Sequence, residues 1–399
     1  MKDNLQVVKM LTDGEFESLE TATDAKLDKA MQCSNASPEP KAEDVDTDVY
    51  APAKFTPADY ETDRRLRLAI AKGEVKREIT YAQALVEAAR EEMLRDPRVF
   101  IMGEDVGLYG GAYGATRDLY KEFGEWRVID TPISEATIGG AAVGAAMAGM
   151  RPIAEIMYVD FTPLAMDQIA NQGAKNRYMF GGKTSVPMVI RTEGGAGRAI
   201  AAHHSQSLES LWTHFPGIYV VMPSTPYDAK GLLKAAIQDD NPVMFIEHKM
   251  LYKEKGFVPE EEYIIPFGVA DIKRPGKDVT LVTYSRMVYR SLEAAEALAK
   301  DGLDVEVIDL RTLKPLDINT IVTSVKKTGR LVCVSEAYEN TGFINEVMMQ
   351  VNEQAFDYLD APMVRVASAN VPVPRAEILE DNAIPNVARI MAACRKVVS

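Results

Sequence analysis

The sequence of 399 residues contains only three cysteines, and their positions exclude most cysteine chemistry. Cys33, Cys333 and Cys394 are too widely spaced to suggest a disulfide framework or the closely spaced ligands of a zinc or iron–sulfur site. The first 20 residues are acidic and lack both the apolar core of a secretory signal and the arginine-rich composition of a transit peptide. We therefore expect a cytoplasmic protein.

Basic charge is scarce as well, because 45 lysines and arginines face 59 aspartates and glutamates and leave a net charge of −14. A protein that binds nucleic acid needs a basic surface for the phosphates, so this composition argues against a nucleic-acid partner. No run approaches the ~20 apolar residues of a membrane span. We therefore expect neither a nucleic-acid nor a membrane partner.

Familiar phosphate-binding and nucleophile motifs are also missing. The sequence contains no GxxxxGK[ST] phosphate loop, no dinucleotide fingerprint and no GxSxG nucleophile elbow. Nothing in it predicts a phosphate site, although its carboxylates and histidines suit acid–base chemistry.

Residues 1–78 form an acidic extension that we expect to be partly disordered. The first 50 residues contain twelve acidic and five basic residues and so carry half of the net charge. Residues 33–60 are rich in proline, aspartate and serine without an apolar period, which is typical of a solvated linker. A helix is predicted from Pro57 to Ala71. The stretch LDKA at 27–30 resembles the lysine turn of a lipoyl domain, but the surrounding composition favours a helix.

From residue 79 onward, short apolar runs alternate with segments of helical period. The predicted strands are VFIM, PIAEIM, VPMVIR, IYVVM and VMFIEH in the first half, and VTLVTY, DVEVIDL, RLVCVSE and MVRVA in the second. The predicted helices are 80–96, 134–149, 160–180, 225–240, 287–302, 342–357 and 384–397. This alternation indicates an α/β fold with mainly parallel sheets. We expect two domains, 79–255 and 275–399, joined by a polar stretch.

One carboxylate, Glu135, stands at the start of a helix that otherwise contains mostly glycine and alanine, IGGAAVGAAMAG. An acid at this position interacts favourably with the helix dipole. The helix offers no cation, however, so a buried Glu135 would need a hydrogen-bond donor such as a ligand. Gly140, Gly144 and Ala148 lie on one side of the helix. This stripe fits a helix buried against its own sheet, and equally a close helix pair at a subunit interface.

Two further clusters contain candidate functional residues. The stretch GGAGRAIAAHHSQSLESLW at 194–212 is a glycine-rich loop with adjacent His203 and His204, and a helix is predicted to start at Ser205. The pair fits surface histidines, or an acid–base group at the mouth of a site. The stretch MGEDVGLYGGAYGATRD at 102–118 places Glu104 at the carboxyl end of a strand, where α/β sheets bind ligands.

Several long motifs together resemble one family. GEDVGLYGGAYGATRDL, DTPISEATIGGAAVGAAMAGMRPI, AAHHSQSLESLW and VVMPSTPYDAKGLLKAAIQDDNPV are similar to the β subunits of thiamine-diphosphate-dependent 2-oxo acid dehydrogenases of the pyruvate or acetoin type. The resemblance implies a transketolase-like pyrimidine-binding domain at 79–255 and a transketolase C-terminal domain at 275–399. It also implies a heterotetramer of two α and two β subunits, in which the α subunit holds the magnesium ion and the diphosphate.

The resemblance assigns roles to residues around the cofactor. Glu135 would hydrogen bond to N1′ of the aminopyrimidine of thiamine diphosphate and favour its imino tautomer, and Glu104 would support Glu135. Met157 and Phe161 would pack on the pyrimidine ring. The cofactor would lie across the interface between α and β subunits.

Two other assignments follow from the same resemblance. His204 would serve the reaction intermediate and the transfer to a lipoyl arm, although His203 stands where many relatives have glutamine, so either imidazole could do so. A structural potassium site, built largely from backbone oxygens, would fall on Met188, Ala236, Asp239 and Asn241.

The implied reaction is the oxidative decarboxylation of pyruvate and the reductive acetylation of lipoyl groups on an acyltransferase partner. Acetoin cleavage is the alternative within the same chemistry, and branched-chain 2-oxo acids are a weaker one. A non-catalytic scaffold subunit is the alternative from another class. A ferredoxin-linked oxidoreductase conflicts with the lack of clustered cysteines.

Overall fold

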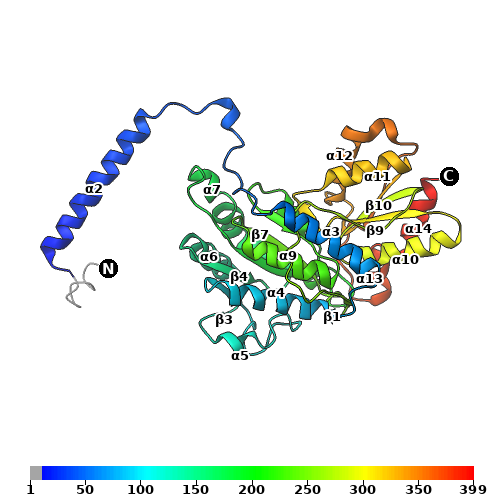
Figure 1. Ribbon diagram of the computed structural model, residues 1–399, viewed down its shortest axis with the longest axis horizontal. Helices are drawn as coiled ribbons and strands as arrows, with labels where there is room; N and C mark the ends of the chain where they lie inside the picture. Colours follow the sequence, from blue (N-terminus) through cyan, green and yellow to red (C-terminus); the bar gives the residue numbers. More distant parts are fainter. Residues whose placement is uncertain (1–10) are drawn as a thin grey trace. The chain divides into compact units, whose positions relative to one another are not determined.

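The computed structural model describes residues 11–399, which divide into two compact units, the first ending at Thr47 and the second comprising Asp48–Ser399. The first unit contains helix α2 (Asp13–Ala36) and the 3-10 helix η1 (Ala42–Asp44) (Figure 1). The LDKA stretch lies inside α2, so the prediction of a helix rather than a lipoyl turn is confirmed. No helix within residues 11–399 is long and apolar enough to cross a membrane.

The end of the predicted linker belongs to the second unit and packs within it. The ring of Tyr50 stacks on that of Tyr219 at 4.8 Å between centroids, and the backbone of Ala51 exchanges two hydrogen bonds with the side-chain amide of Asn241. The prediction of a solvated linker over 33–60 was therefore wrong at these two residues, because their partners lie far away in the sequence. Residues 33–36 also differ from it, since they belong to α2.

Helix α3 (Pro57–Ala71) has the predicted bounds and belongs to the second unit. Asp63 and Leu66 are buried on its inner face. Part of the acidic extension is thus integral to the folded unit.

The larger sheet of the second unit has seven strands, in the order β12-β6-β7-β5-β4-β2-β3. All its pairs are parallel except the pair of β12 and β6. The strands are β2 (Val99–Gly103), β3 (Val128–Asp130), β4 (Arg151–Glu155), β5 (Val189–Gly194), β6 (Tyr219–Val221), β7 (Val243–His248) and β12 (Thr312–Lys314).

Both faces of this sheet are covered, because successive side chains of a strand point to opposite faces. Val99 and Ile101 belong to an apolar cluster with α4 (Tyr81–Arg95) and α9 (Pro226–Gln238). Phe100 and Met102 belong to the cluster on the other face, which includes α6 (Glu135–Met147).

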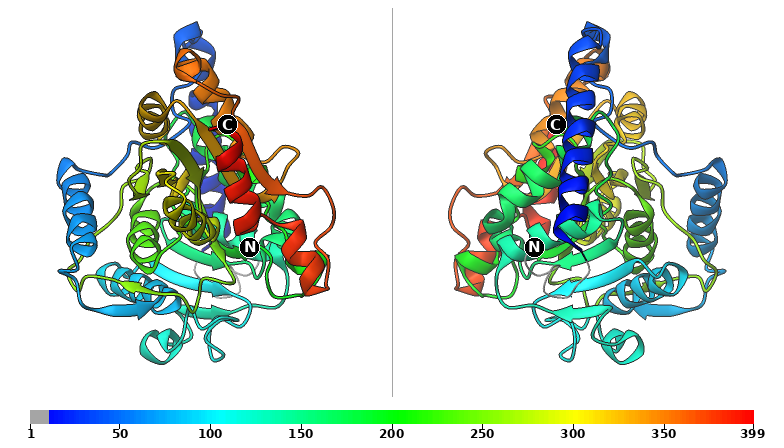
Figure 2. Two further views of the ribbon diagram at one scale, coloured as in Figure 1. Left: turned by 90° about the vertical axis from the view of Figure 1, so that its right-hand side faces the viewer. Right: turned by 90° about the vertical axis from the view of Figure 1, so that its left-hand side faces the viewer.

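A five-stranded sheet follows, in the order β14-β13-β10-β11-β9, and only β9 is antiparallel to its neighbour. Its strands are β9 (Asp271–Arg274), β10 (Val279–Thr283), β11 (Val305–Asp309), β13 (Leu331–Tyr338) and β14 (Val364–Ser368). Helices α10 (Met287–Lys300) and α14 (Val387–Lys396) pack together on one face (Figure 2). Helices α11 (Ile318–Thr328) and α12 (Ile344–Ala355) pack on the other, in the cluster that also contains α6.

The remaining short elements complete the second unit. Strands β1 (Glu78–Thr80) and β8 (Lys255–Phe257) form a two-stranded antiparallel pair. The short helices are α5 (Leu119–Phe123), α7 (Asn176–Met179), α8 (Glu209–Thr213), α13 (Glu377–Ala383) and the 3-10 helices η4 (Ala202–His204) and η5 (Phe356–Tyr358).

The structure differs from the predicted elements at several places, and the short strands β1, β3, β8 and β9 and the short helices α5 and α13 were not predicted. The predicted helix 160–180 is broken into the 3-10 helix η2 (Val159–Ala165), which contains a proline, the π-helix η3 (Asp167–Gly173) and the single turn α7. The helix predicted to start at Ser205 begins only at Glu209. Neither α11 nor β12 was predicted, and β12 joins the seven-stranded sheet although it follows β11 of the other sheet.

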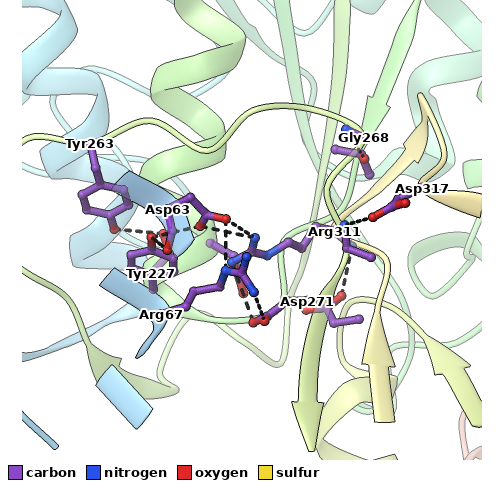
Figure 3. A network of polar contacts seen from close by, with 12 residues as sticks. Asp63, Arg67, Tyr227, Tyr263, Gly268, Asp271, Arg311 and Asp317 are labelled. Atoms are coloured by element: carbon purple, nitrogen blue, oxygen red, sulfur yellow. Dashed lines mark hydrogen bonds and ion pairs between the residues drawn. The ribbon is translucent and has the colours of Figure 1, made fainter. Parts of the chain in front are cut away.

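A buried network of ion pairs fastens α3 to both sheets (Figure 3). The fully buried guanidinium of Arg311 lies 3.2 Å from the Asp63 carboxylate of α3 and 2.7 Å from the Asp228 carboxylate of α9. Lys273 of β9 lies 2.7 Å from Asp228 and 2.8 Å from Asp271. Three elements from distant parts of the chain therefore meet at one buried cation.

Replacing Asp63 by alanine should destabilise the protein, because it removes a carboxylate that faces a buried guanidinium. Removal of one partner of a buried ion pair typically costs about 3 kcal/mol or more of the free energy of unfolding. Urea denaturation measures this loss. Glu61→Ala on the same helix is the control, since Glu61 pairs with Arg64 in solvent and its loss should change stability far less. Equal stabilities of the two variants would contradict this account of the network.

Candidate active site

The candidate residues gather at the carboxyl edge of the seven-stranded sheet. Glu104 directly follows β2, and Glu135 begins α6 shortly after β3. Met157 and Phe161 follow β4, and His204 ends the loop that follows β5. Parallel α/β sheets bind ligands at this edge, where the loops leave the strands.

Glu135 is half-buried and has no counter-charge. Among residues 11–399, its carboxylate takes part in no hydrogen bond and no ion pair, although it is the first residue of α6. The pKa of Glu104 is raised by burial first, and then by the nearby charges of Asp105 and Glu135. The two glutamates predicted to act together therefore lie close enough to interact electrostatically.

The opposite sides of α6 differ in packing. Ile138, Ala142 and Val143 are buried, and a Cβ atom at Gly139 would lie 3.1 Å from Ala165 of η2. A Cβ atom at Gly144 would meet no atom within 4 Å, and the exposed residues on that side of the helix are Thr137, Ala141, Gly144 and Ala148. Much of the small-residue stripe is therefore open and not buried against the sheet.

His204 is the histidine that meets the predicted cofactor residues. Its imidazole packs edge-to-face against Phe161 at 5.6 Å and against Tyr158 at 5.0 Å between centroids. The Lys249 ammonium donates a hydrogen bond of 2.5 Å to the His204 backbone carbonyl. His203 is exposed and makes no ring contact among the described residues. The geometry therefore favours His204 over His203.

Sequence reasoning missed the buried charges beneath this histidine. Lys249 is buried, donates to the Gly195 carbonyl at 3.0 Å and lies 4.8 Å from the centre of the Tyr158 ring. Burial lowers the pKa of Lys249, while burial raises the pKa of neighbouring Glu193. Both residues lie at the carboxyl ends of adjacent strands, β5 and β7. Their position after predicted strands was the feature of the sequence that could have marked them as site residues.

Comparisons with known proteins identify both domains of the chain. Residues 77–255 match the transketolase pyrimidine-binding domain, and residues 268–390 match the transketolase C-terminal domain. The chain is 51% identical over 330 residues to the β subunit of acetoin:2,6-dichlorophenolindophenol oxidoreductase of Cupriavidus necator, which covers 80% of this chain and 97% of that relative. The chain belongs to the β-subunit family of thiamine-diphosphate-dependent 2-oxo acid and acetoin dehydrogenases.

Other members of this β-subunit family are nearly as similar. The β subunit of the pyruvate dehydrogenase E1 component of Rhizobium meliloti is 48% identical over 330 residues, 82% of this chain and 72% of that one. The 2-oxoisovalerate dehydrogenase β subunit of Bacillus subtilis is 46% identical over 321 residues, 80% of this chain and 98% of that one. A solved split-gene transketolase in an inactive β4 tetramer has a TM-score of 0.64 at 24% identity, and covers 80% of this chain and 98% of its own. That last likeness shows the shared fold alone.

The four residues predicted for a potassium site in this β-subunit family lie together and are buried. The Asp239 carboxylate accepts hydrogen bonds from the backbone and side-chain amide of Asn241, and the Met188 carbonyl accepts one from Val243. The second carboxylate oxygen of Asp239 has no partner among the described residues, and Ala236 lies one turn earlier on α9. One unpartnered oxygen is open to a cation here, and the potassium site stays a prediction.

Glu209 is a buried acid where the pyrimidine-binding and C-terminal domains meet. Tyr284 of the C-terminal domain donates a hydrogen bond of 2.7 Å to its carboxylate. Burial raises the pKa of Glu209 to about 7 from 4.5, and the Tyr284 hydrogen bond opposes this rise only partly. The folded protein therefore keeps a proton that the unfolded chain releases between these two pH values.

The stability of the protein should consequently fall as pH rises through this window. A carboxyl group whose pKa is higher in the folded than in the unfolded state stabilises the fold at low pH. This shift corresponds to about 3 kcal/mol of the free energy of unfolding, which is lost by pH 8. Urea denaturation of the native protein and of Glu209→Gln at pH 5 and pH 8 measures the effect. The difference between the two proteins should change by most of this amount, since part of it is already lost at pH 5, and parallel pH profiles would refute the assignment.

Proposed function

We propose that the chain is the β subunit of the decarboxylating component of a pyruvate dehydrogenase complex. With an α subunit and thiamine diphosphate, it would oxidatively decarboxylate pyruvate and acetylate the lipoyl groups of an acyltransferase. The observation that carries the proposal is Glu135, a half-buried carboxylate without a cation at the carboxyl edge of the sheet. The 48% identity to the pyruvate dehydrogenase β subunit of Rhizobium meliloti is compatible with pyruvate as the substrate.

The residues at this edge fit the aminopyrimidine half of the cofactor. Glu135 provides an unpaired carboxylate for the ring nitrogen N1′, and the half-buried Met157 and Phe161 provide apolar surface for the ring. When bound, thiamine diphosphate supplies the nucleophilic carbon and the electron sink that decarboxylation requires. The diphosphate and its magnesium ion would be held by the α subunit.

Glu104 lies close enough to Glu135 to feel its charge. Burial first, and then the neighbouring carboxylates Asp105 and Glu135, raise the pKa of Glu104. We assign Glu104 the role of supporting Glu135 from this neighbouring position.

His204 would act at the opening of the site. Its imidazole is only partly buried and is held between Tyr158 and Phe161, while Lys249 fixes the backbone that carries it. A ring nitrogen in this position can exchange a proton with the reacting groups when the lipoyl arm accepts the acyl group.

The open side of α6 supports the proposed assembly. Exposed alanine and glycine at helical spacing allow another backbone to approach closely, and Gly144 has free space over its Cα atom. We therefore assign this surface to a close contact with another subunit of the proposed heterotetramer.

Acetoin cleavage is the second candidate, because the chain is 51% identical to the acetoin oxidoreductase β subunit of Cupriavidus necator. The same Glu135 and His204 would serve both substrates. Branched-chain 2-oxo acids are a third possibility, in line with the 46% identity to the Bacillus subtilis 2-oxoisovalerate dehydrogenase β subunit. A non-catalytic scaffold role would leave the unpaired Glu135 without a purpose.

Glu135→Gln should lower the activity of the α–β complex by at least ~100-fold while leaving its assembly intact, because an amide cannot replace the carboxylate at N1′. Turnover with dye reduction measures activity, and analytical ultracentrifugation measures assembly. Glu125→Gln is the control, since Glu125 is exposed and lies outside the site. A fully active Glu135→Gln complex would refute the assigned role.

A further inference from the structure

The loop between β5 and His204 contains unfavourable backbone conformations that neighbouring residues must stabilise. Residues 195–201 form neither helix nor strand. Ala199 has φ +53° and Ala201 has φ +67°, which lie in the left-handed region that alanine rarely adopts. Each such residue costs on the order of 1 kcal/mol or more, so surrounding contacts must hold it there.

Two carboxylates from the C-terminal domain make those contacts. Glu380 of α13 accepts hydrogen bonds from the backbone N–H groups of Gly197 at 2.9 Å and Ala199 at 3.0 Å, one on each carboxylate oxygen. Glu336 of β13 accepts one from the N–H of Ala196 at 2.5 Å. Charged acceptors make the stronger hydrogen bonds to backbone N–H groups, so these three contacts within four residues fix this part of the loop.

Glu336 and Glu380 are paired differently. Burial works to raise the pKa of Glu336, but His248, at 3.1 Å, and Arg286 bring it down to about 2. Glu336 is therefore charged, with the Arg286 guanidinium as a nearby counter-charge. Glu380 is buried, only 4% exposed, and forms no ion pair within residues 11–399. Both of its carboxylate oxygens accept hydrogen bonds from the loop backbone and from no other group among the described residues.

Contacts from Arg286 and Lys249 fix the rest of the loop, including the backbone of His204. Arg286 of the C-terminal domain donates to the Ala196 carbonyl at 2.8 Å. Lys249 bridges the two ends of the loop, because its ammonium donates both to the Gly195 and to the His204 carbonyl. The middle of the loop is thus held by the C-terminal domain and its ends by the pyrimidine-binding domain.

We propose that Glu380 is a positioning residue, which holds the 195–204 loop by its two backbone hydrogen bonds and thereby sets the place of His204. The proposal rests on the function proposed for His204. This role would explain how the stretch EILEDNAIP near the C-terminus, which contains Glu380, contributes to the site. The C-terminal domain is then a contributor to the active site and not only a neighbour of it.

The test compares variants in the assembled α–β complex with thiamine diphosphate. The rate of lipoyl acetylation is measured for Glu380→Ala, Glu380→Gln and His204→Ala. Glu377→Gln is the matched control on the same helix, because Glu377 is exposed.

Glu380→Ala should slow acyl transfer at least tenfold, and Glu380→Gln should have an intermediate effect, because its amide oxygen can accept only from one side. The Glu377→Gln control should keep the native rate. In a His204→Ala background, Glu380→Ala should cause little further loss, since both changes act through the same imidazole. Trypsin should also cleave after the exposed Arg198 faster in Glu380→Ala than in the native complex.

The possible failures can be told apart. A native rate in His204→Ala would refute the function proposed for that histidine. A slow His204→Ala with native rates in both Glu380 variants would refute the positioning role alone. An equal slowing by Glu380→Ala with and without His204 would show a general structural effect and refute it too. If Glu380→Ala does not assemble, the near-isosteric Glu380→Gln decides by the same criteria.

Discussion

The buried guanidinium of Arg311 fixes how the two sheets of the protein meet. It is fully buried, and its nearest counter-charges come from α3 and α9, which lie on one side of the seven-stranded sheet. Its backbone carbonyl accepts a hydrogen bond from Met222 directly after β6, and β12 follows at once. A charge in the interior tolerates little displacement of its partners, so these ion pairs constrain how the five-stranded sheet docks. Docking in this way places β13 and α13 over the loop that leads to His204.

The acidic side chains of the seven-stranded sheet and its edge differ in whether a cation pairs with them. Glu155 and Glu247 are buried against Arg191 at 3.0 and 2.5 Å, as is usual for carboxylates inside a protein. Glu135 at the edge of the same sheet has no such partner among the described residues. An acid left uncompensated next to residues suited to an aromatic ring is what a cofactor with a ring nitrogen needs. The diphosphate would be bound elsewhere, in keeping with the absence of a phosphate-binding motif from the sequence.

Much of the fold could be predicted from the sequence because the signals are local. The apolar runs of 4–7 residues became parallel strands that are mostly buried, and α3 has its predicted bounds. The site residues came from a family resemblance, and the structure adds that His204, not His203, meets Phe161.

The parts that could not be predicted depend on distant contacts. Nothing near Thr312 indicates that its strand joins the other sheet, and nothing near Ala51 reveals its bonds to Asn241. The hydrogen bonds of Glu380 connect residues more than 180 positions apart. Such contacts follow from the docking of the two domains, which leaves no periodic pattern in the sequence.

The central claim is that this chain forms, with an α subunit, a thiamine-diphosphate-dependent enzyme acting on pyruvate. The most direct measurement is dye reduction by the native complex purified through this chain, with and without thiamine diphosphate, on pyruvate, acetoin and branched-chain 2-oxo acids. The account predicts cofactor-dependent turnover with pyruvate as the preferred substrate. Preference for acetoin or a branched-chain acid would contradict the substrate, and no turnover on any of them with the α subunit and cofactor present would contradict the catalytic role.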